Sequence, residues 1–450
     1  MTDGHRAALN ARQRRQVLRR WLQPGIGIKR WLAIAFFGEI LIAIAAAYIL
    51  RPILAPARTD NGTLDIGEIV TLQFLPPEMR ALVFFAFGAL LFVYGAWRVL
   101  RTIVEPYRMR DEPLAEMLYQ RRLRARGPRI VAIGGGTGLS VLLRGLKQVT
   151  SNITAVVTVA DDGGSSGKLR TQLGVPPMGD IRNCIAALAD AEPAMSSLLG
   201  YRFPAGNGHD PHLAGHAFGN LLIAALTDVT GDFEEAVRQS NRVLAVRGSV
   251  VPVAGHPITL HAELEDGSTL EGESQIEHAH GIKRIWITPD DVRPSAEALT
   301  AIANADVVVI GPGSLYTSLL PPLLVPGMRE VLADTRAARL FVCNVATQLG
   351  ETEGYGVSDH LAALAAHGLS GLVDAVVVND NVHARQLPDD PAAPVAIDVE
   401  LRRSLSPLIV SRDVVDADNA HRHDSRKLTA AIMELYDERT VMRRKHALAS

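Results

Sequence analysis

Two long apolar runs mark the N-terminal quarter of the chain. One covers residues 31–50 and is broken only by Glu39, and the other covers residues 81–97 without any charged residue. Each run is about long enough, as a helix, to cross the hydrocarbon core of a bilayer, which is about 30 Å thick. The pattern predicts a transmembrane hairpin of two helices within residues 31–100, joined by a short loop on the outside.

Basic residues flank the two apolar runs on their outer sides. Residues 1–30 hold eight Lys and Arg against one acid, and residues 98–129 hold nine Arg against four acids. The connection 51–80 is nearly balanced, with three basic and four acidic residues. Because Lys and Arg accumulate on the cytoplasmic side of membrane spans, we expect a multi-pass protein of the cell membrane whose N-terminus and C-terminal domain are both cytoplasmic.

The positions of the two spans define the segments that flank them. Residues 1–30 are predicted to be a basic cytoplasmic tail and residues 101–128 a juxtamembrane linker. A cleaved signal peptide or a pair of buried core helices are the alternatives. A signal peptide has a shorter apolar region and would not be followed by a second span and another arginine block. For Glu39 we expect a tolerated polar contact, which costs less if the residue faces the partner helix, and a functional role is the alternative.

From residue 129 onward the pattern changes to short β-branched runs that alternate with helical periods. Apolar runs at 129–133, 154–159, 306–310 and 341–345 each end at a loop of small or polar residues. Continuous apolar strands separated by helices indicate a parallel sheet that is buried on both faces. We therefore predict an α/β domain over 129–440 with a Rossmann-like, doubly wound and mostly parallel sheet. Its ligand would bind beyond the carboxyl ends of the strands.

One region interrupts this alternation. The pair Asp266-Gly267 suits a tight hairpin turn between two short strand-like runs, so residues 249–290 are predicted to be an antiparallel insertion.

The net charge of the domain argues against one class of partner, nucleic acids. Residues 130–450 hold 26 Lys and Arg against 38 Asp and Glu, a net charge of −12. Because nucleic-acid affinity depends on clustered cations, a nucleic-acid partner is not expected.

Two glycine-rich loops are the first candidates for ligand binding. Both follow a predicted strand and precede a helix, so their backbone amides and the helix dipole suit a phosphate, although turn geometry alone is the alternative. The first is not a strict dinucleotide fingerprint, because Leu139 stands at its last glycine position. The candidate residues are Gly134, Gly135, Gly136, Thr137 and Gly138 in the first loop and Gly311, Gly313, Ser314, Tyr316 and Thr317 in the second.

A third loop combines acids with hydroxyls. Asp161 and Asp162 end the second strand and are followed by Ser165 and Ser166 in a glycine-rich stretch that fails the Walker A pattern. Two adjacent carboxylates suit Mg²⁺ or sugar hydroxyls, and an acid at this strand end also suits a ribose. A helix cap is the alternative, which explains one carboxylate better than two.

Further polar residues open later helical runs. Asp180, Asn183 and Asn220 stand beside glycines, and Arg422 offers a cation for a diphosphate, against the alternative of a surface salt bridge. His209, His212 and His216 have spacing that suggests a metal, but no acid or cysteine is placed to complete a site.

Taken in order, the motifs resemble the YvcK group of the CofD-like family, often called gluconeogenesis factors. They are IGGGTGLSVLLRGLK, TVADDGGSSGKLR, GDIRN, GHAFGNLL, VRGSVVP, IGPGSLYTSLLPPLLVPG, CNVATQLGET, SRDVVDAD and RHDS. The resemblance implies a nucleotide-sugar-binding domain whose ligand is a UDP-sugar, chiefly UDP-N-acetylglucosamine. It also implies phosphate contacts from the two glycine loops and Arg422, and polar contacts from Asn183, Asn220 and Asn344. The membrane hairpin is not part of the usual family pattern.

The same resemblance implies a regulator of cell shape, cell-wall synthesis and carbon flux under gluconeogenic growth. We expect it to be non-catalytic and homo-oligomeric, with cell-wall synthesis proteins as possible partners. The first alternative is a CofD-type transferase of 2-phospho-L-lactate, which uses Mg²⁺. A nicotinamide-dependent oxidoreductase is a weaker alternative, suggested only by the first glycine turn and a distant acid, and a scaffold role is compatible with the regulator.

Overall fold

The computed structural model describes residues 28–54, 75–104, 114–204, 212–381, 392–397 and 407–449. These residues form two compact units, one within residues 1–118 and the other within residues 119–450. Most of the predicted basic tail and of the predicted outside loop lies outside the described residues, so those two predictions are not addressed by the structure.

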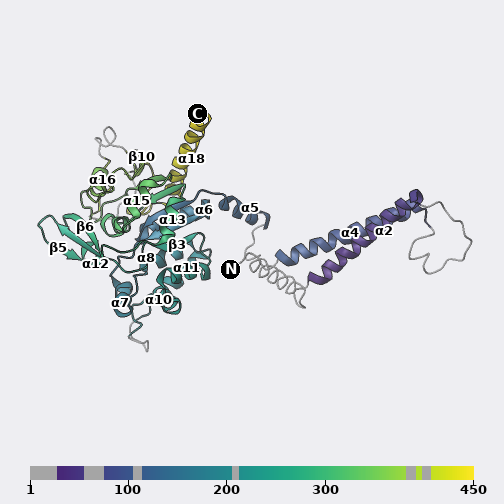
Figure 1. Ribbon diagram of the computed structural model, residues 1–450, viewed down its shortest axis with the longest axis horizontal. Coiled ribbons are helices and arrows are strands. Elements are labelled where there is room, and N and C mark those ends of the chain that lie inside the picture. Colours follow the sequence, from purple (N-terminus) through teal and green to yellow (C-terminus); the bar gives the residue numbers. More distant parts are fainter. Residues whose placement is uncertain are drawn as a thin grey trace, which may run out of the picture. The chain divides into compact units, whose positions relative to one another are not determined.

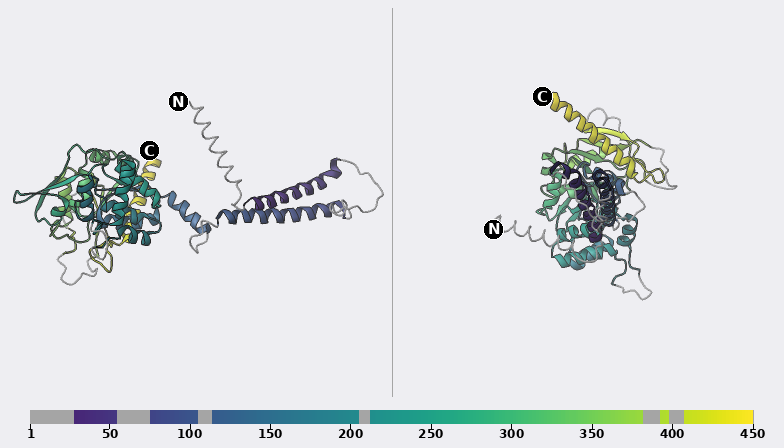
Figure 2. Two further views of the ribbon diagram at one scale, coloured as in Figure 1. Left: turned by 90° about the horizontal axis from the view of Figure 1, so that it is seen from below. Right: turned by 90° about the vertical axis from the view of Figure 1, so that its right-hand side faces the viewer.

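The first unit consists of two long helices that lie side by side, α2 (Ile28–Leu54) and α4 (Pro77–Val104) (Figures 1 and 2). Glycines allow the two backbones to approach closely. A Cβ on Gly38 would meet the carbonyl oxygen of Gly88 at 2.6 Å, and one on Gly95 would meet the backbone nitrogen of Ala35 at 2.7 Å. Because later residues of α4 meet earlier residues of α2, the helices are antiparallel, and small residues at the contact are typical of membrane helix pairs.

The outer surface of this hairpin is apolar. Phe36 is 63% exposed and Leu82 is 66% exposed, which is unlike the core helix of a soluble protein. Glu39 is also exposed, so it does not lie on the face that contacts α4. The reason is geometric: Gly38 occupies the contact face, and the next residue of a helix points about 100° away from it.

Aromatic and basic side chains gather at one end of the hairpin. The guanidinium carbon of Arg98 lies 4.1 Å from the ring centre of Trp31, and the Trp31 and Tyr94 rings meet edge to face with their centres 5.8 Å apart. Such a combination is typical of the level at which a membrane meets water.

The predicted linker is partly helical. Helix α5 (Leu114–Ala125) begins directly after Pro113, and proline favours a helix start as much as a linker. The chain after α5 packs on the second unit, where the side chain of Asn152 donates to the carbonyl oxygens of Ala125 and Gly127 at 3.1 and 2.7 Å. The second unit therefore begins before residue 129.

A seven-stranded sheet, parallel throughout, forms the centre of the second unit, in the order β10-β9-β8-β7-β1-β2-β3. Its central strands are β-branched and almost wholly buried, which is why they read as continuous apolar runs. The strands are β1 (Ile130–Gly134), β2 (Ile153–Val157), β3 (Ser249–Pro252), β7 (Val307–Ile310), β8 (Ala338–Val342), β9 (Ala375–Asn379) and β10 (Leu408–Arg412).

The chain order of these strands reverses between β1 and β7. From β1 the chain moves outward to β2 and β3, and from β7 it moves the other way to β8, β9 and β10. Right-handed crossovers in opposite directions place their helices on opposite faces of the sheet, which makes the fold doubly wound, as predicted. A ligand crevice is expected beyond the carboxyl ends of β1 and β7, where the direction changes.

Helices connect and cover these strands (Figure 1). The first crossover helix, α6, packs against α8 and α18. It buries Leu139, Leu142, Leu143 and Leu146, the spacing of one helix face. The helices of this unit after α5 are α6 (Gly136–Val149), α7 (Gly164–Leu173), α8 (Gly179–Leu188), α9 (Glu192–Gly200), α10 (Phe218–Thr230), α11 (Phe233–Val243), α12 (Glu273–Ile276), α13 (Ala296–Ala303), η2 (Leu315–Leu319), α14 (Leu320–Leu324), α15 (Met328–Asp334), α16 (Val357–Ala366) and α18 (Ser425–Ala449).

The antiparallel insertion is present but shorter than predicted. Strands β4 (Thr259–Leu264), β5 (Thr269–Glu271) and β6 (Ile282–Thr288) form a small antiparallel sheet that extends from one side of the unit in Figure 1. The predicted Asp266-Gly267 turn joins β4 to β5, with Gly267 at φ +83°. The prediction that the insertion begins at 249 is wrong, because β3 pairs in parallel with β2 at the edge of the main sheet.

Candidate functional site

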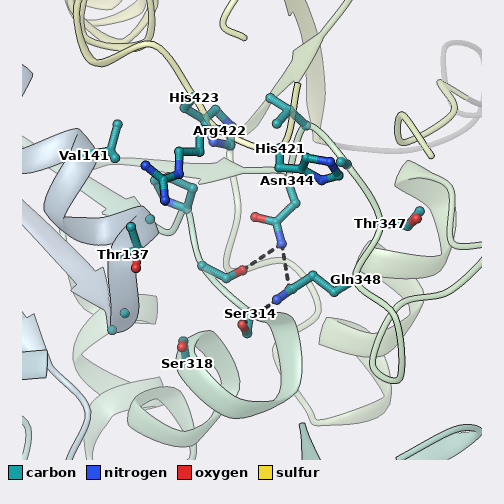
Figure 3. A pocket seen from close by; sticks show the side chains of 17 residues that line it. Thr137, Val141, Ser314, Ser318, Asn344, Thr347, Gln348, His421, Arg422 and His423 are labelled. Atoms are coloured by element: carbon teal, nitrogen blue, oxygen red, sulfur yellow. Dashed lines mark hydrogen bonds between the residues drawn. The ribbon is translucent and has the colours of Figure 1, made fainter. Parts of the chain in front are cut away.

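A cavity of about 360 Å³ lies at the point where the strand order reverses (Figure 3). Four loops surround it, and they follow β1, β7 and β8 or precede α18. Its walls are formed by Gly135, Gly136, Thr137, Gly138, Val141, Pro312, Gly313, Ser314, Ser318, Asn344, Val345, Ala346, Thr347, Gln348, His421, Arg422 and His423. The position is the one that doubly wound sheets use for ligands.

The first glycine loop presents backbone rather than side chains to this cavity. Gly136, the first residue of α6, has φ +67°, a conformation that favours glycine. A Cβ on Gly138 would meet the carbonyl oxygen of Pro312 at 2.6 Å, so the two glycine loops approach each other only because that side chain is absent. Gly134 and Gly311 are buried behind the loops and do not line the cavity.

The second glycine loop is held by two amide side chains (Figure 3). Asn344 Nδ2 donates to the Gly313 carbonyl oxygen at 2.9 Å and to Gln348 Oε1 at 3.2 Å. Gln348 Nε2 donates to Ser314 Oγ at 2.8 Å. Asn344, predicted as a ligand contact, lines the cavity and also fixes the loop that would bind the ligand.

Tyr316 and Thr317, two further predicted contacts, point away from the cavity. They belong to η2, a π-helical turn, and both are buried. The Glu351 carboxylate accepts from the Tyr316 N–H at 3.1 Å and from the Thr317 hydroxyl at 2.7 Å. Burial raises the pKa of Glu351 to about 7. This carboxylate therefore supports the second glycine loop from behind.

Arg422 is the cation of this cavity. Figure 3 shows its side chain extending toward Thr137 of the first loop. Among the described residues, its guanidinium group has no hydrogen bond or ion pair with the protein, so the surface salt bridge considered from sequence does not form with them. The neighbouring His423 is buried, and its Nε2 lies 3.2 Å from the carbonyl oxygen of Cys343. Burial lowers the pKa of His423 to about 4, so the neutral ring donates this bond.

A second compartment of about 240 Å³ lies beside the first. It contains polar residues that the sequence predicted as ligand contacts, and these come from the loop after β2 and from the first turns of α7, α8 and α10. Its walls are formed by Asp161, Gly163, Gly164, Ser165, Ser166, Gly179, Asp180, Arg182, Asn183, Arg202 and Asn220. The buried Asn220 Nδ2 donates to Ser165 Oγ at 3.2 Å and to Ser166 Oγ at 3.4 Å, which fixes the hydroxyls on its wall.

Asp180 stands between the two compartments. A Cβ on Gly135 would overlap its carboxylate, and this carboxylate accepts a hydrogen bond from the backbone N–H of Gly136 at the start of α6. Burial is the main cause that raises the pKa of Asp180 to about 6, and the nearby Asp161 adds to it. A carboxylate and a ligand phosphate would therefore compete for the same helix N-terminus.

The position of Asp180 predicts how binding depends on pH. With EDTA present, we expect the affinity for UDP-N-acetylglucosamine to fall about tenfold from pH 5 to pH 7.5, because ionised Asp180 repels the diphosphate. The free energy of unfolding should fall from about pH 4 to about pH 6, because in this interval the folded protein holds a proton on Asp180 that the unfolded chain releases. Asp180→Asn should flatten the affinity profile measured by calorimetry and reduce the fall in stability measured by thermal unfolding, to which Glu351 and Glu273 also contribute. An unchanged profile in this variant would assign the titration to another group.

Asp161 and Asp162 do not act as a pair. Asp161 Oδ1 accepts from the Gly163 N–H at 2.8 Å and its carboxyl group faces the second compartment, whereas Asp162 Oδ1 accepts from the Ser274 N–H at 2.8 Å. Neighbouring residues of an extended chain point to opposite sides, which explains the divergence. In the ranges that the structure describes, no group of three or more His, Cys, Asp or Glu is placed to hold a metal ion. The predicted two-carboxylate Mg²⁺ site therefore does not fit this arrangement.

Glu273 adds a third acid beside the second compartment. Its carboxyl group forms a hydrogen bond with Asp161, and burial together with Asp161 and Asp180 raises the pKa of Glu273 to about 9. Near neutral pH Glu273 therefore holds its proton. Sequence reasoning missed Glu273, which comes from the insertion more than one hundred residues away along the chain.

The structure thus divides the predicted site residues into three groups. Gly135, Gly136, Thr137, Gly138, Gly313, Ser314, Asn344 and Arg422 line the first cavity, and Asp161, Ser165, Ser166, Asp180, Asn183 and Asn220 line the second. Gly134, Asp162, Gly311, Tyr316 and Thr317 line neither. Of the histidines considered for a metal, His209 lies outside the described residues, and His216 Nδ1 lies 3.2 Å from Ser165 Oγ.

Comparison with known proteins identifies the second unit. Residues 130–415 match the family described as "2-phospho-L-lactate transferase CofD". A protein named "Gluconeogenesis factor" from Bacillus subtilis is 46% identical over 69% of this chain and 99% of its own length. A crystal structure of a UPF0052 family member from Bacillus halodurans superposes with a TM-score of 0.63 at 46% identity, covering 68% of this chain and 99% of that one.

The relatives differ in how much of the chain they share. A relative from Nostoc sp. is 44% identical over 96% of this chain and 97% of its own length. The Bacillus proteins instead reach nearly their full length within about two thirds of this chain. The family match itself begins at residue 130, so the apolar hairpin lies outside the part that defines the family.

Proposed function

The chain belongs to the gluconeogenesis-factor (YvcK) group of the CofD-like family, and on this premise we propose that it is a membrane-anchored regulator that binds a UDP-sugar. We propose UDP-N-acetylglucosamine as the ligand. The diphosphate would lie in the first cavity, between the two glycine loops, and the sugar would extend toward the second compartment.

The observation that carries this proposal is Arg422 above the two glycine loops. Its guanidinium has no partner among the described residues, and its side chain extends toward Thr137 in the first turn of α6. A guanidinium group and a helix N-terminus are two of the strongest donors for a phosphate in proteins. Their convergence at the switch point supports a nucleoside diphosphate as the central part of the ligand.

The chemistry of the first cavity supports binding rather than turnover. Its polar side chains are hydroxyls, amides and Arg422, together with His421 and a His423 ring that is already engaged with Cys343. We expect full-length protein in detergent to retain radiolabelled UDP-N-acetylglucosamine on a filter and to return it chemically intact, with or without Mg²⁺. Failure to retain the label would refute the ligand, and recovery of UDP or UMP would refute the absence of turnover.

A specific observation also favours the transferase as a second candidate. Asp180 lies between the two compartments, and its pKa of about 6 suits a general base near neutral pH. In this alternative Asp180 would accept the proton of a hydroxyl acceptor held in the second compartment. The acceptor oxygen would form the new bond to the phosphorus of the activated phospho-acid, and the bond to the nucleoside phosphate would break so that this group leaves. A CofD-type activity on an activated 2-phospho-L-lactate with Mg²⁺ would then depend on Asp180, and Asp180→Asn would abolish it.

We propose that α2 and α4 anchor the protein in the cell membrane. Both helices are long and apolar enough to span a bilayer, and their exposed faces carry large apolar side chains. The arginines and tryptophans at one end of the hairpin support an orientation with that end at the cytoplasmic surface.

The membrane proposal predicts how the protein fractionates. Full-length protein should stay in the membrane pellet after washing with alkaline carbonate, because two spans resist extraction, and a variant that lacks residues 1–104 should enter the supernatant. Release of the full-length protein by carbonate would contradict the anchor. A reporter inserted between the spans should be active only outside the cytoplasm.

We further propose that ligand occupancy regulates cell shape, wall synthesis and carbon flux, through a homo-oligomer and cell-wall synthesis proteins. A strain that lacks the gene should lose its normal shape on gluconeogenic carbon sources. Wild-type protein should restore the shape, whereas Arg422→Gln should not. Equal rescue by both proteins would separate the cellular role from ligand binding.

A further inference from the structure

The second compartment has one wall of positive charge that the proposed ligand does not use. Arg182 comes from α8 and Arg202 from the segment after α9, and both line the compartment. Arg182 is half-buried and its aliphatic part packs against α10, where a Cβ on Gly219 would meet its Cγ at 2.7 Å. The packing fixes this guanidinium at the wall of the compartment.

The protein supplies only neutral partners to the Arg182 guanidinium. Nη2 donates to Asn183 Oδ1 at 2.9 Å, and Nη1 donates to Asn220 Oδ1 at 3.2 Å. Arg202 Nη1 donates to the Gly215 carbonyl oxygen at 2.9 Å. Within the described part of the chain neither guanidinium forms an ion pair with a carboxylate. A half-buried cation without a counter-ion is unfavourable and attracts an anion.

The electrostatic balance supports the same conclusion. Burial is the main cause that lowers the pKa of Arg182, and the neighbouring Arg202 lowers it further, whereas Asp180 and Asp161 act in the opposite direction with smaller effect. Each of these acids therefore acts on Arg182 less strongly than the neighbouring arginine does.

Further donors surround the same space. The hydroxyls of Ser165 and Ser166 and the first residues of α7 and α8 lie on its walls, and α10 contributes the side chain of Asn220. Helix N-termini favour negative charge, and here they accompany two guanidinium groups inside a defined cavity.

We propose that the second compartment binds a carboxylate or phosphate group through Arg182 and Arg202, so that the cleft recognises an anion in addition to the diphosphate. The inference rests on the proposed function for the first cavity and specifies the class of group beside it. The anion could belong to the sugar of the nucleotide ligand, as in a hexuronate, or to a separate small molecule that binds next to it.

Two experiments on full-length protein in detergent distinguish these sources. The first compares UDP-glucuronate with UDP-glucose, which differ in a single carboxylate at C6. The second adds inorganic phosphate to protein saturated with UDP-glucose. Each is repeated with Arg182→Gln, with Arg202→Gln and with the control Arg242→Gln, an exposed arginine of α11 that lines neither cavity. Because Arg202 is exposed, its variant is expected to fold even if Arg182→Gln does not.

We expect at least a tenfold preference for UDP-glucuronate if the anion is part of the sugar, or submillimolar phosphate binding if it is a separate molecule. In the two arginine variants, the preference for UDP-glucuronate or the affinity for phosphate should fall at least tenfold. In Arg242→Gln both should stay as in wild type. The inference is overturned if wild-type protein shows neither effect, or if the arginine variants leave both unchanged. A further outcome separates the two proposals. If no UDP-sugar binds but phosphate binds without nucleotide, and this binding depends on the two arginines, the proposed function is refuted and this inference stands.

Discussion

Replacing Arg422 with Gln lowers the affinity for UDP-N-acetylglucosamine about 30- to 100-fold, the result expected for the loss of one charge-assisted contact of about 2–3 kcal/mol. The cause is that no other described arginine or lysine lines the first cavity, so no neighbouring side chain replaces the charge. Isothermal titration of full-length variant and wild type in the same detergent measures the ratio of dissociation constants.

Arg426→Gln is the matched control for this change. Arg426 is an exposed arginine at the start of α18, four residues away, and it lines neither cavity. Its replacement should leave the affinity within about twofold of wild type. Equal losses in both variants would mean that a general change of surface charge, and not a contact at the diphosphate, lowers the affinity.

The second large effect concerns stability. Glu351→Ala should lower the free energy of unfolding by about 3–5 kcal/mol, because it removes a buried acceptor and leaves the Tyr316 N–H and the Thr317 hydroxyl unsatisfied beside a cavity. Glu351→Gln keeps one acceptor oxygen and should lose less. Thermal unfolding followed by circular dichroism should show the order wild type, then Gln, then Ala.

Glu353 provides the comparison within the same loop. It is exposed and pairs with His280 at 3.0 Å on the surface, so Glu353→Ala should cost less than about 1 kcal/mol. If Glu351→Ala is no more destabilising than Glu353→Ala, the carboxylate does not support the second glycine loop.

The position of the first cavity could be predicted from the sequence. Loops of small residues after apolar strands indicate a parallel sheet, and parallel strands place their carboxyl ends at one edge. Gly138 and Gly313 thus meet at a site that their sequence context already indicates. The strands β9 and β10 were missed, although β9 is a short apolar run much like the strands that were found.

Side-chain direction could not be predicted in the same way. Thr317 follows a glycine turn as a ligand contact would, but the π-helical turn of η2 directs it to Glu351, more than thirty residues ahead. Asp161 and Asp162 were treated as a pair, whereas an extended backbone separates them. A single sequence does not reveal such tertiary partners.

The role of the second compartment also depends on tertiary contacts that a single sequence does not reveal. Arg182 belongs to the GDIRN motif, but only its neighbours Asp180 and Asn183 were predicted as site residues. Its importance arises from the approach of Arg202 and from the lack of a carboxylate partner among the described residues. Both are properties of the packed structure.

The proposed function requires that the cleft at the strand switch point binds a UDP-sugar. Isothermal titration of full-length protein in detergent with UDP-N-acetylglucosamine tests it most directly, with Mg²⁺ and with EDTA. We expect saturable binding of one ligand per chain in both conditions, and we expect Arg422→Gln to weaken it. No heat of binding in either condition, from protein that is folded by circular dichroism, would contradict it.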